Sequence, residues 1–133
     1  MKRILIVDDQ PDIREMIHHA LRDSFELEMA NNADQAYEQI MIAIPDAIVL
    51  DVMMPGTMDG YQLCEVIKKD PKLAGILVVL ITACGQVADQ ELGRTLGADA
   101  YFVKPFSPLQ LERYLKDVLL AGQAAPDHGW KEL

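Results

Sequence analysis

Five short, mainly apolar runs recur along the chain, and polar residues follow each of them. Runs of this length between polar boundaries are typical of buried β-strands. The fourth run, ILVVLIT, is dominated by the β-branched residues that strands favour. We therefore predict five strands, at residues 3–9, 25–30, 46–51, 76–82 and 100–103.

An amphipathic segment follows each predicted strand. In the first, Ile13, Ile17 and Leu21 recur at every fourth position, which is the spacing of one helical face. The fourth helix, at residues 87–96, is the weakest because Gly93 interrupts it. The first, second, third and fifth helices each begin near residues that favour a helix start, either because they cap it or because proline fixes φ. These residues are Pro11, Asn32 with Gln35, Asp59, and Ser107 with Pro108 and Gln110.

Strand and helix alternate five times, which predicts an α/β fold. Continuous apolar strands separated by amphipathic helices favour a doubly wound parallel sheet with helices on both faces. We expect one domain over residues 1–120. Residues 121–133 lose all periodicity and are interpreted as a C-terminal tail or the start of a linker.

Composition narrows the functional classes. The chain has 133 residues, of which 50% are hydrophobic, and no stretch is long enough to cross a bilayer. Its two cysteines, Cys64 and Cys84, predict no disulfide framework and fit a reducing cytoplasm. A net charge of −9 argues against direct binding of nucleic acid by this segment.

Polar residues gather where the predicted strands end. Asp8 and Asp9 end the first strand, Asp51 the third and Thr82 the fourth, and Lys104 follows the fifth. Ligands of open α/β sheets bind beyond the carboxyl ends of the strands. If the first and third strands are neighbours, three carboxylates converge and repel one another unless a cation lies among them. An all-oxygen site of this kind suits Mg²⁺ better than zinc.

Four motifs carry a family resemblance: VDD at residues 7–9, LDVMMPG and DG within residues 50–60, LITA at residues 80–83 and YFVKPF at residues 101–106. Because the four motifs occur in this order and at these spacings, the chain resembles the receiver domain of two-component response regulators, the CheY-like superfamily, over about residues 2–120. The resemblance implies a five-stranded sheet of flavodoxin-like strand order 2-1-3-4-5.

The resemblance also implies a chemistry. Asp51 would accept a phosphoryl group from a sensor histidine kinase or a phosphotransfer protein, which makes the chain a signalling switch rather than a conventional enzyme. Mg²⁺ would be held by Asp8, Asp9, Asp51 and the backbone carbonyl of Met53.

Further residues receive roles in the same way. Thr82 and Lys104 would bind phosphoryl oxygens, Tyr101 would be the aromatic switch, and the bond before Pro105 would be cis. Thr82 would draw its loop inward after phosphorylation and vacate space for Tyr101. The surface of the last two helices and the last strand would then change.

Two residues are expected to tune dephosphorylation. In receivers, the positions two beyond the phosphoacceptor and two beyond the switch hydroxyl flank the path of attacking water, and here these are Met53 and Cys84. A thioether and a thiol are weak hydrogen-bonding groups and orient water poorly. We expect slow self-dephosphorylation.

The sequence departs from the family pattern at two places. Thr57 and Met58 stand between Pro-Gly and Asp-Gly, where many members have one residue, which affects the shape of the loop. Ala100 replaces a second acid that is frequent in DNA-binding members, which argues against the dimer that such members form through the last two helices and the last strand.

Other functional classes fit less well. A haloacid-dehalogenase-type phosphatase requires Asp-x-Asp after the first strand, and a flavodoxin relative requires a loop rich in hydroxyl groups and glycine. A non-phosphorylated pseudo-receiver that binds proteins remains open. The output is unknown: the chain is interpreted either as a stand-alone receiver or as one domain of a longer regulator or hybrid kinase.

Overall fold

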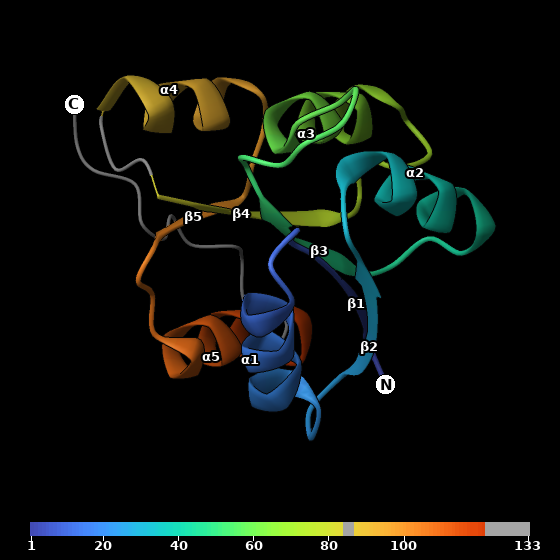
Figure 1. Cartoon of the computed structure of the whole chain (residues 1–133). Helices are drawn as coiled ribbons and strands as arrows, with labels where there is room; N and C mark the ends of the chain where they lie inside the picture. Colours follow the sequence, from blue (N-terminus) through green and yellow to red (C-terminus); the bar gives the residue numbers. More distant parts are fainter. Residues whose placement is uncertain (84–86, 122–133) are drawn as a thin grey trace.

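The computed structural model describes residues 1–83 and 87–121 (Figure 1). Strands and helices alternate through this part of the chain, as the hydrophobic pattern predicted. The elements are β1 (Arg3–Val7), α1 (Pro11–Leu21), β2 (Glu26–Ala30), α2 (Ala33–Ile42), β3 (Ala47–Asp51), α3 (Gly60–Lys69), β4 (Leu77–Thr82), α4 (Val87–Thr95), β5 (Ala100–Val103) and α5 (Pro108–Leu119).

The sheet has the order β2-β1-β3-β4-β5, and all its neighbouring strands are parallel, which confirms the expected flavodoxin-like topology. Helices α1 and α5 cover one face, and α2, α3 and α4 cover the other (Figure 1). Every residue of β3 and β4 is buried. In contrast, the edge strand β2 exposes Glu26, Glu28 and Met29. The uninterrupted apolar runs therefore mark the strands that are covered on both faces.

Several predicted strand boundaries are too wide. Strand β1 ends at Val7, because the Asp8 carboxylate accepts a hydrogen bond from the backbone N–H of Gln10 at 2.9 Å and turns the chain out of the sheet. Asp8 and Asp9 therefore lie in the loop between β1 and α1. Helix α1 ends at Leu21, where the backbone N–H of Ser24 bonds the Leu21 carbonyl at 3.0 Å.

The predicted helix caps form, with differences in detail. Asp59 and Gln62 make the reciprocal capping box at α3. At α2, Asn32 accepts the expected bond from Gln35, but the Gln35 side chain accepts the N–H of Asn31 instead of returning to Asn32. Such caps satisfy backbone donors that a helix start leaves without partners.

Each face of the sheet carries its own apolar cluster. Cys64 belongs to the cluster under α2 and α3, where burial raises the pKa of its thiol to about 12. This neutral side chain packs as a small apolar group. Cys84 lies outside the described residues. No helix in residues 1–83 or 87–121 is long and apolar enough to span a membrane.

Candidate functional site

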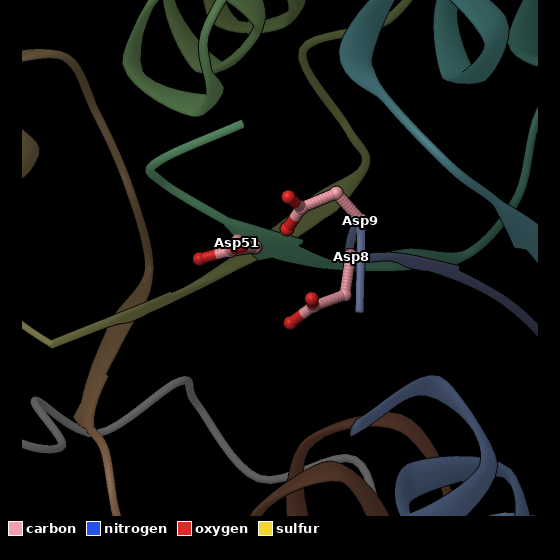
Figure 2. Close-up of side chains that lie close together, drawn as sticks. All are labelled: Asp8, Asp9 and Asp51. Atoms are coloured by element: carbon pink, nitrogen blue, oxygen red, sulfur yellow. The ribbon is translucent and has the colours of Figure 1, made fainter. Parts of the chain in front are cut away.

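The carboxyl ends of the central strands bring the predicted polar residues together. Val7 pairs with Leu50 in register, so the residues that follow β1 lie beside Asp51 at the end of β3. Thr82 ends β4 and pairs with Val103 of β5, one residue before Lys104. The side chains of Asp8, Asp9 and Asp51 leave adjacent strand ends and point toward the same side of them (Figure 2).

Three carboxylates form the centre of the site. Asp8, Asp9 and Asp51 each offer an oxygen, and these oxygens all lie within 4.8 Å of one another. Asp8 is 1% exposed and Asp51 is 4% exposed, whereas Asp9 lies at the surface. Two of the three negative charges are therefore withdrawn from water, which is costly without a compensating cation.

Lys104 supplies part of that compensation. Its ammonium lies 3.3 Å from Asp8 Oδ2 and 3.4 Å from Asp51 Oδ1. Burial and, to a smaller extent, the negative charge of Asp8 nevertheless raise the pKa of Asp51 to about 6, against the opposing effects of Lys104 and of a hydrogen bond from the Met53 backbone. The cluster keeps a surplus of negative charge that one ammonium does not neutralise.

This surplus makes the donor set a good match for a divalent cation. Carboxylate oxygens are the ligands that Mg²⁺ prefers, and the exposed position of Asp9 leaves room for the water that Mg²⁺ retains. The chemistry of these residues therefore fits the Mg²⁺ that the sequence predicted.

The loop after Asp51 is fixed at both ends. Met54 is buried, and the backbone N–H of Gly60 bonds the Val52 carbonyl at 2.9 Å. A β-carbon at Gly60 would lie 2.3 Å from the carbonyl oxygen of Asp51, so the start of α3 touches the backbone of Asp51 directly. Only glycine permits this approach.

A contact that the sequence did not suggest holds the middle of the same loop. The Asp34 carboxylate of α2 accepts hydrogen bonds from the Thr57 hydroxyl at 2.7 Å and from the Thr57 backbone N–H at 3.3 Å. The two residues are far apart in sequence, and no motif joins them. These two hydrogen bonds tie the middle of the loop to α2.

The remaining predicted residues lie at different depths. Thr82 and Tyr101 are fully buried, and Tyr101 belongs to the apolar cluster under α2 and α3. The Met53 side chain is 66% exposed, and Cys84 is outside the described residues. The Lys104–Pro105 peptide bond is cis.

Comparison with known families decides the assignment. Residues 4–116 match the family described as the response regulator receiver domain. The chain belongs to this family. The receiver-domain motifs recognised in the sequence therefore correspond to a true family relationship.

Similar proteins agree with the receiver assignment. The response regulator Rre1 of Synechocystis sp. is 36% identical over 128 residues, which are 95% of this chain and 55% of that protein. The phosphate regulon transcriptional regulatory protein PhoB of Pseudomonas aeruginosa is 44% identical over 119 residues, which are 89% of this chain and 52% of that protein. This receiver chain spans about half the length of these relatives.

A solved receiver structure has the same fold. The chemotaxis response regulator CheY4 of Vibrio cholerae superimposes with a TM-score of 0.82 at 31% identity, and the match covers 90% of this chain and 99% of that one.

Proposed function

We propose that this receiver domain takes a phosphoryl group onto Asp51 from the phosphohistidine of a sensor histidine kinase or phosphotransfer protein, in a reaction that depends on Mg²⁺. One observation carries the proposal. The buried Asp51 carboxylate lies with two further acids and an ammonium at the carboxyl edge of a parallel sheet.

The ligands proposed for Mg²⁺ are Asp8, Asp9, Asp51 and the backbone carbonyl of Met53. A cation bound there would neutralise charge on the phosphoryl oxygens. Phosphoryl transfer needs little beyond alignment and charge neutralisation, so a site with this donor set is sufficient.

The protein residues perform the transfer itself. An Asp51 carboxylate oxygen attacks phosphorus, the new O–P bond forms as the P–N bond of phosphohistidine breaks, and the imidazole leaves with the bonding electrons. Lys104, which in the unphosphorylated site pairs with Asp8 and Asp51, moves its ammonium to a phosphoryl oxygen. The Thr82 hydroxyl donates a hydrogen bond to another phosphoryl oxygen.

Phosphorylation is proposed to act on the surface of α4, β5 and α5. The aspartyl phosphate adds roughly −1.5 to −2 charges and three acceptor oxygens. Thr82 lies at the end of β4, next to the segment that leads into α4, so a bond from its hydroxyl pulls on that segment. Tyr101 of β5 then repacks as the aromatic switch.

The biological setting is also part of the proposal. We place the domain in the cytoplasm, where its kinase delivers the phosphoryl group. Its named relatives include transcriptional regulators, and the output of the whole protein is expected to come from a further domain or a docking partner rather than from this acidic segment. Met53 and Cys84 are proposed to keep self-dephosphorylation slow.

Intact-mass measurement after treatment with acetyl phosphate tests the proposal. We expect one phosphoryl adduct in the presence of Mg²⁺, none after chelation with EDTA, and none in Asp51→Asn. Glu15→Gln, which removes an exposed acid of α1, serves as the control and should behave like wild type. An adduct of equal yield in Asp51→Asn contradicts the assignment, and its absence from wild type favours a non-phosphorylated protein-binding module.

A further inference from the structure

Arg14 of α1 reaches back to the acidic loop that precedes its own helix. Its Nη1 donates a hydrogen bond of 2.7 Å to the backbone carbonyl oxygen of Asp8. That carbonyl belongs to the planar peptide group that joins Asp8 to Asp9. The guanidinium therefore holds the orientation of the peptide between two of the three clustered acids.

The two acids on either side of this peptide are restrained very differently. The Asp8 carboxylate is buried and bonded to the Gln10 N–H at 2.9 Å and to Lys104 at 3.3 Å, and the Asp8 N–H bonds the Ala30 carbonyl at 3.3 Å. Asp9 is exposed, and within residues 1–83 and 87–121 no hydrogen bond or ion pair restrains its carboxylate. Its side chain diverges from that of Asp8 (Figure 2). The position of the Asp9 carboxylate thus depends on the backbone that carries it.

We infer that Arg14 is a positioning residue for the divalent-cation site, which acts through the Asp8–Asp9 peptide to keep the Asp9 carboxylate in line with those of Asp8 and Asp51. The inference rests on the proposed function, because that function supplies the cation. Groups that orient metal ligands in this way typically contribute about 10-fold or more to metal affinity.

The direction of the change in Mg²⁺ affinity distinguishes positioning by Arg14 from a simple charge effect. A guanidinium beside the cluster repels a divalent cation, so loss of the Arg14 charge alone strengthens Mg²⁺ binding. Loss of the hydrogen bond to the Asp8 carbonyl frees the peptide and weakens Mg²⁺ binding. The two explanations therefore predict opposite changes in the same dissociation constant.

The experiment is a Mg²⁺ titration of the full chain, followed by amide NMR shifts, in wild type, Arg14→Gln and Arg14→Lys. We expect Arg14→Gln to raise the Mg²⁺ dissociation constant about 10-fold. Arg14→Lys keeps the charge and one donor but loses the planar fork, so a smaller rise of about 3-fold is expected. Arg22→Gln, which removes an exposed charge just after α1, is the matched control and should stay within about 2-fold of wild type.

A second readout separates positioning from general damage. The rate of phosphorylation by acetyl phosphate should reach the wild-type value in Arg14→Gln at saturating Mg²⁺, while the Mg²⁺ concentration for half-maximal rate rises in step with the dissociation constant. Unchanged or tighter Mg²⁺ binding in Arg14→Gln overturns the inference and leaves the proposed function standing, provided that wild type is phosphorylated on Asp51. A wild type that neither binds Mg²⁺ nor forms an adduct overturns both.

If Arg14→Gln does not fold, Arg14→Lys decides the matter. The lysine variant keeps the positive charge, so weaker Mg²⁺ binding in that variant supports positioning by the guanidinium, and unchanged binding overturns it.

Discussion

Asp51 is the residue at which the proposed function and the stability of the fold conflict most directly. Its carboxylate is 4% exposed and lies among other acids, and its pKa is raised to about 6. The fold therefore makes ionisation of this carboxyl harder than it is in water, although the proposed attack on phosphorus requires the ionised form. Lys104 reduces this cost without removing it, and a bound cation is the natural complement.

Without Mg²⁺, Asp51→Asn is expected to be more stable than wild type at pH 7.5. A carboxyl with a raised pKa contributes its stability fully below the unfolded value of about 3.8, and this contribution is lost as the pH rises through about 6. The amide mimics the neutral acid at every pH, so the advantage of the variant should be roughly 1–3 kcal/mol at pH 7.5 and vanish near pH 4.

Urea unfolding in EDTA at several pH values between 4 and about 7.5 measures this difference. Glu15→Gln provides an exposed-acid control, for which no comparable pH-dependent gain is expected. An Asp51→Asn variant that is no more stable than wild type at pH 7.5 would show that the folded site holds the ionised carboxylate without strain.

At the scale of elements, α4 is the helix that we expect to be displaced most easily. Gly93 lies inside it and lowers its intrinsic helix propensity. Within the described residues, its ties to α3 include a bond of 3.2 Å from the Tyr61 hydroxyl to the Asp89 carbonyl and a weak contact of 3.8 Å from Cys64 Sγ to the Leu96 carbonyl just beyond the helix. A helix of low intrinsic propensity is expected to respond early to a local change.

Beryllofluoride, a phosphoryl mimic, should therefore alter amide hydrogen exchange most strongly between residues 83 and 106. The strands of the sheet centre should change least, since every residue of β3 and β4 is buried. Asp51→Asn treated in the same way is the control and should show no response. Changes confined to α1 and α2 would place the output surface elsewhere.

At the scale of the whole molecule, a net charge of −9 accompanies the acidic cluster at one edge of the sheet. Both faces of that sheet are closed by apolar clusters, so the acidic edge is where binding of a cation can add to stability. A ligand that binds only the folded state stabilises it in proportion to the logarithm of its concentration.

Mg²⁺ should accordingly raise the melting temperature of the intact chain. At a free Mg²⁺ concentration 100 times the dissociation constant, the free energy of unfolding is expected to rise by about 2.7 kcal/mol. Asp9→Asn removes one proposed ligand at an exposed position and should lose most of this gain, whereas Asp12→Asn, another exposed acid nearby, should keep it. Equal Mg²⁺ responses in the two variants would rule out Asp9 as a ligand.

The sequence predicted the fold to a large extent because the signals involved are local. Apolar runs revealed the strands, and capping residues such as Asp59 revealed the helix starts. The grouping of Asp8, Asp9 and Asp51 followed from topology. The unequal burial of adjacent Asp8 and Asp9 was not predictable, because it depends on how the chain turns after β1.

The supporting contacts of the site were also beyond sequence reasoning. The bond from Arg14 to the Asp8 carbonyl depends on a side-chain conformation, and the tie from Asp34 to Thr57 depends on the path of a loop that meets α2 far along the chain. Motifs record which groups perform chemistry. They record less of what holds those groups in place.

The contact between Gly60 and the backbone of Asp51 has a consequence for the evolution of this loop. A β-carbon at position 60 would lie 2.3 Å from the Asp51 carbonyl oxygen, so we expect no residue other than glycine to be tolerated at this position. The buried Met54 anchors the opposite side of the loop. We therefore expect changes in loop length to be tolerated between these two anchors, where Thr57 lies, because such changes leave the backbone of Asp51 in place.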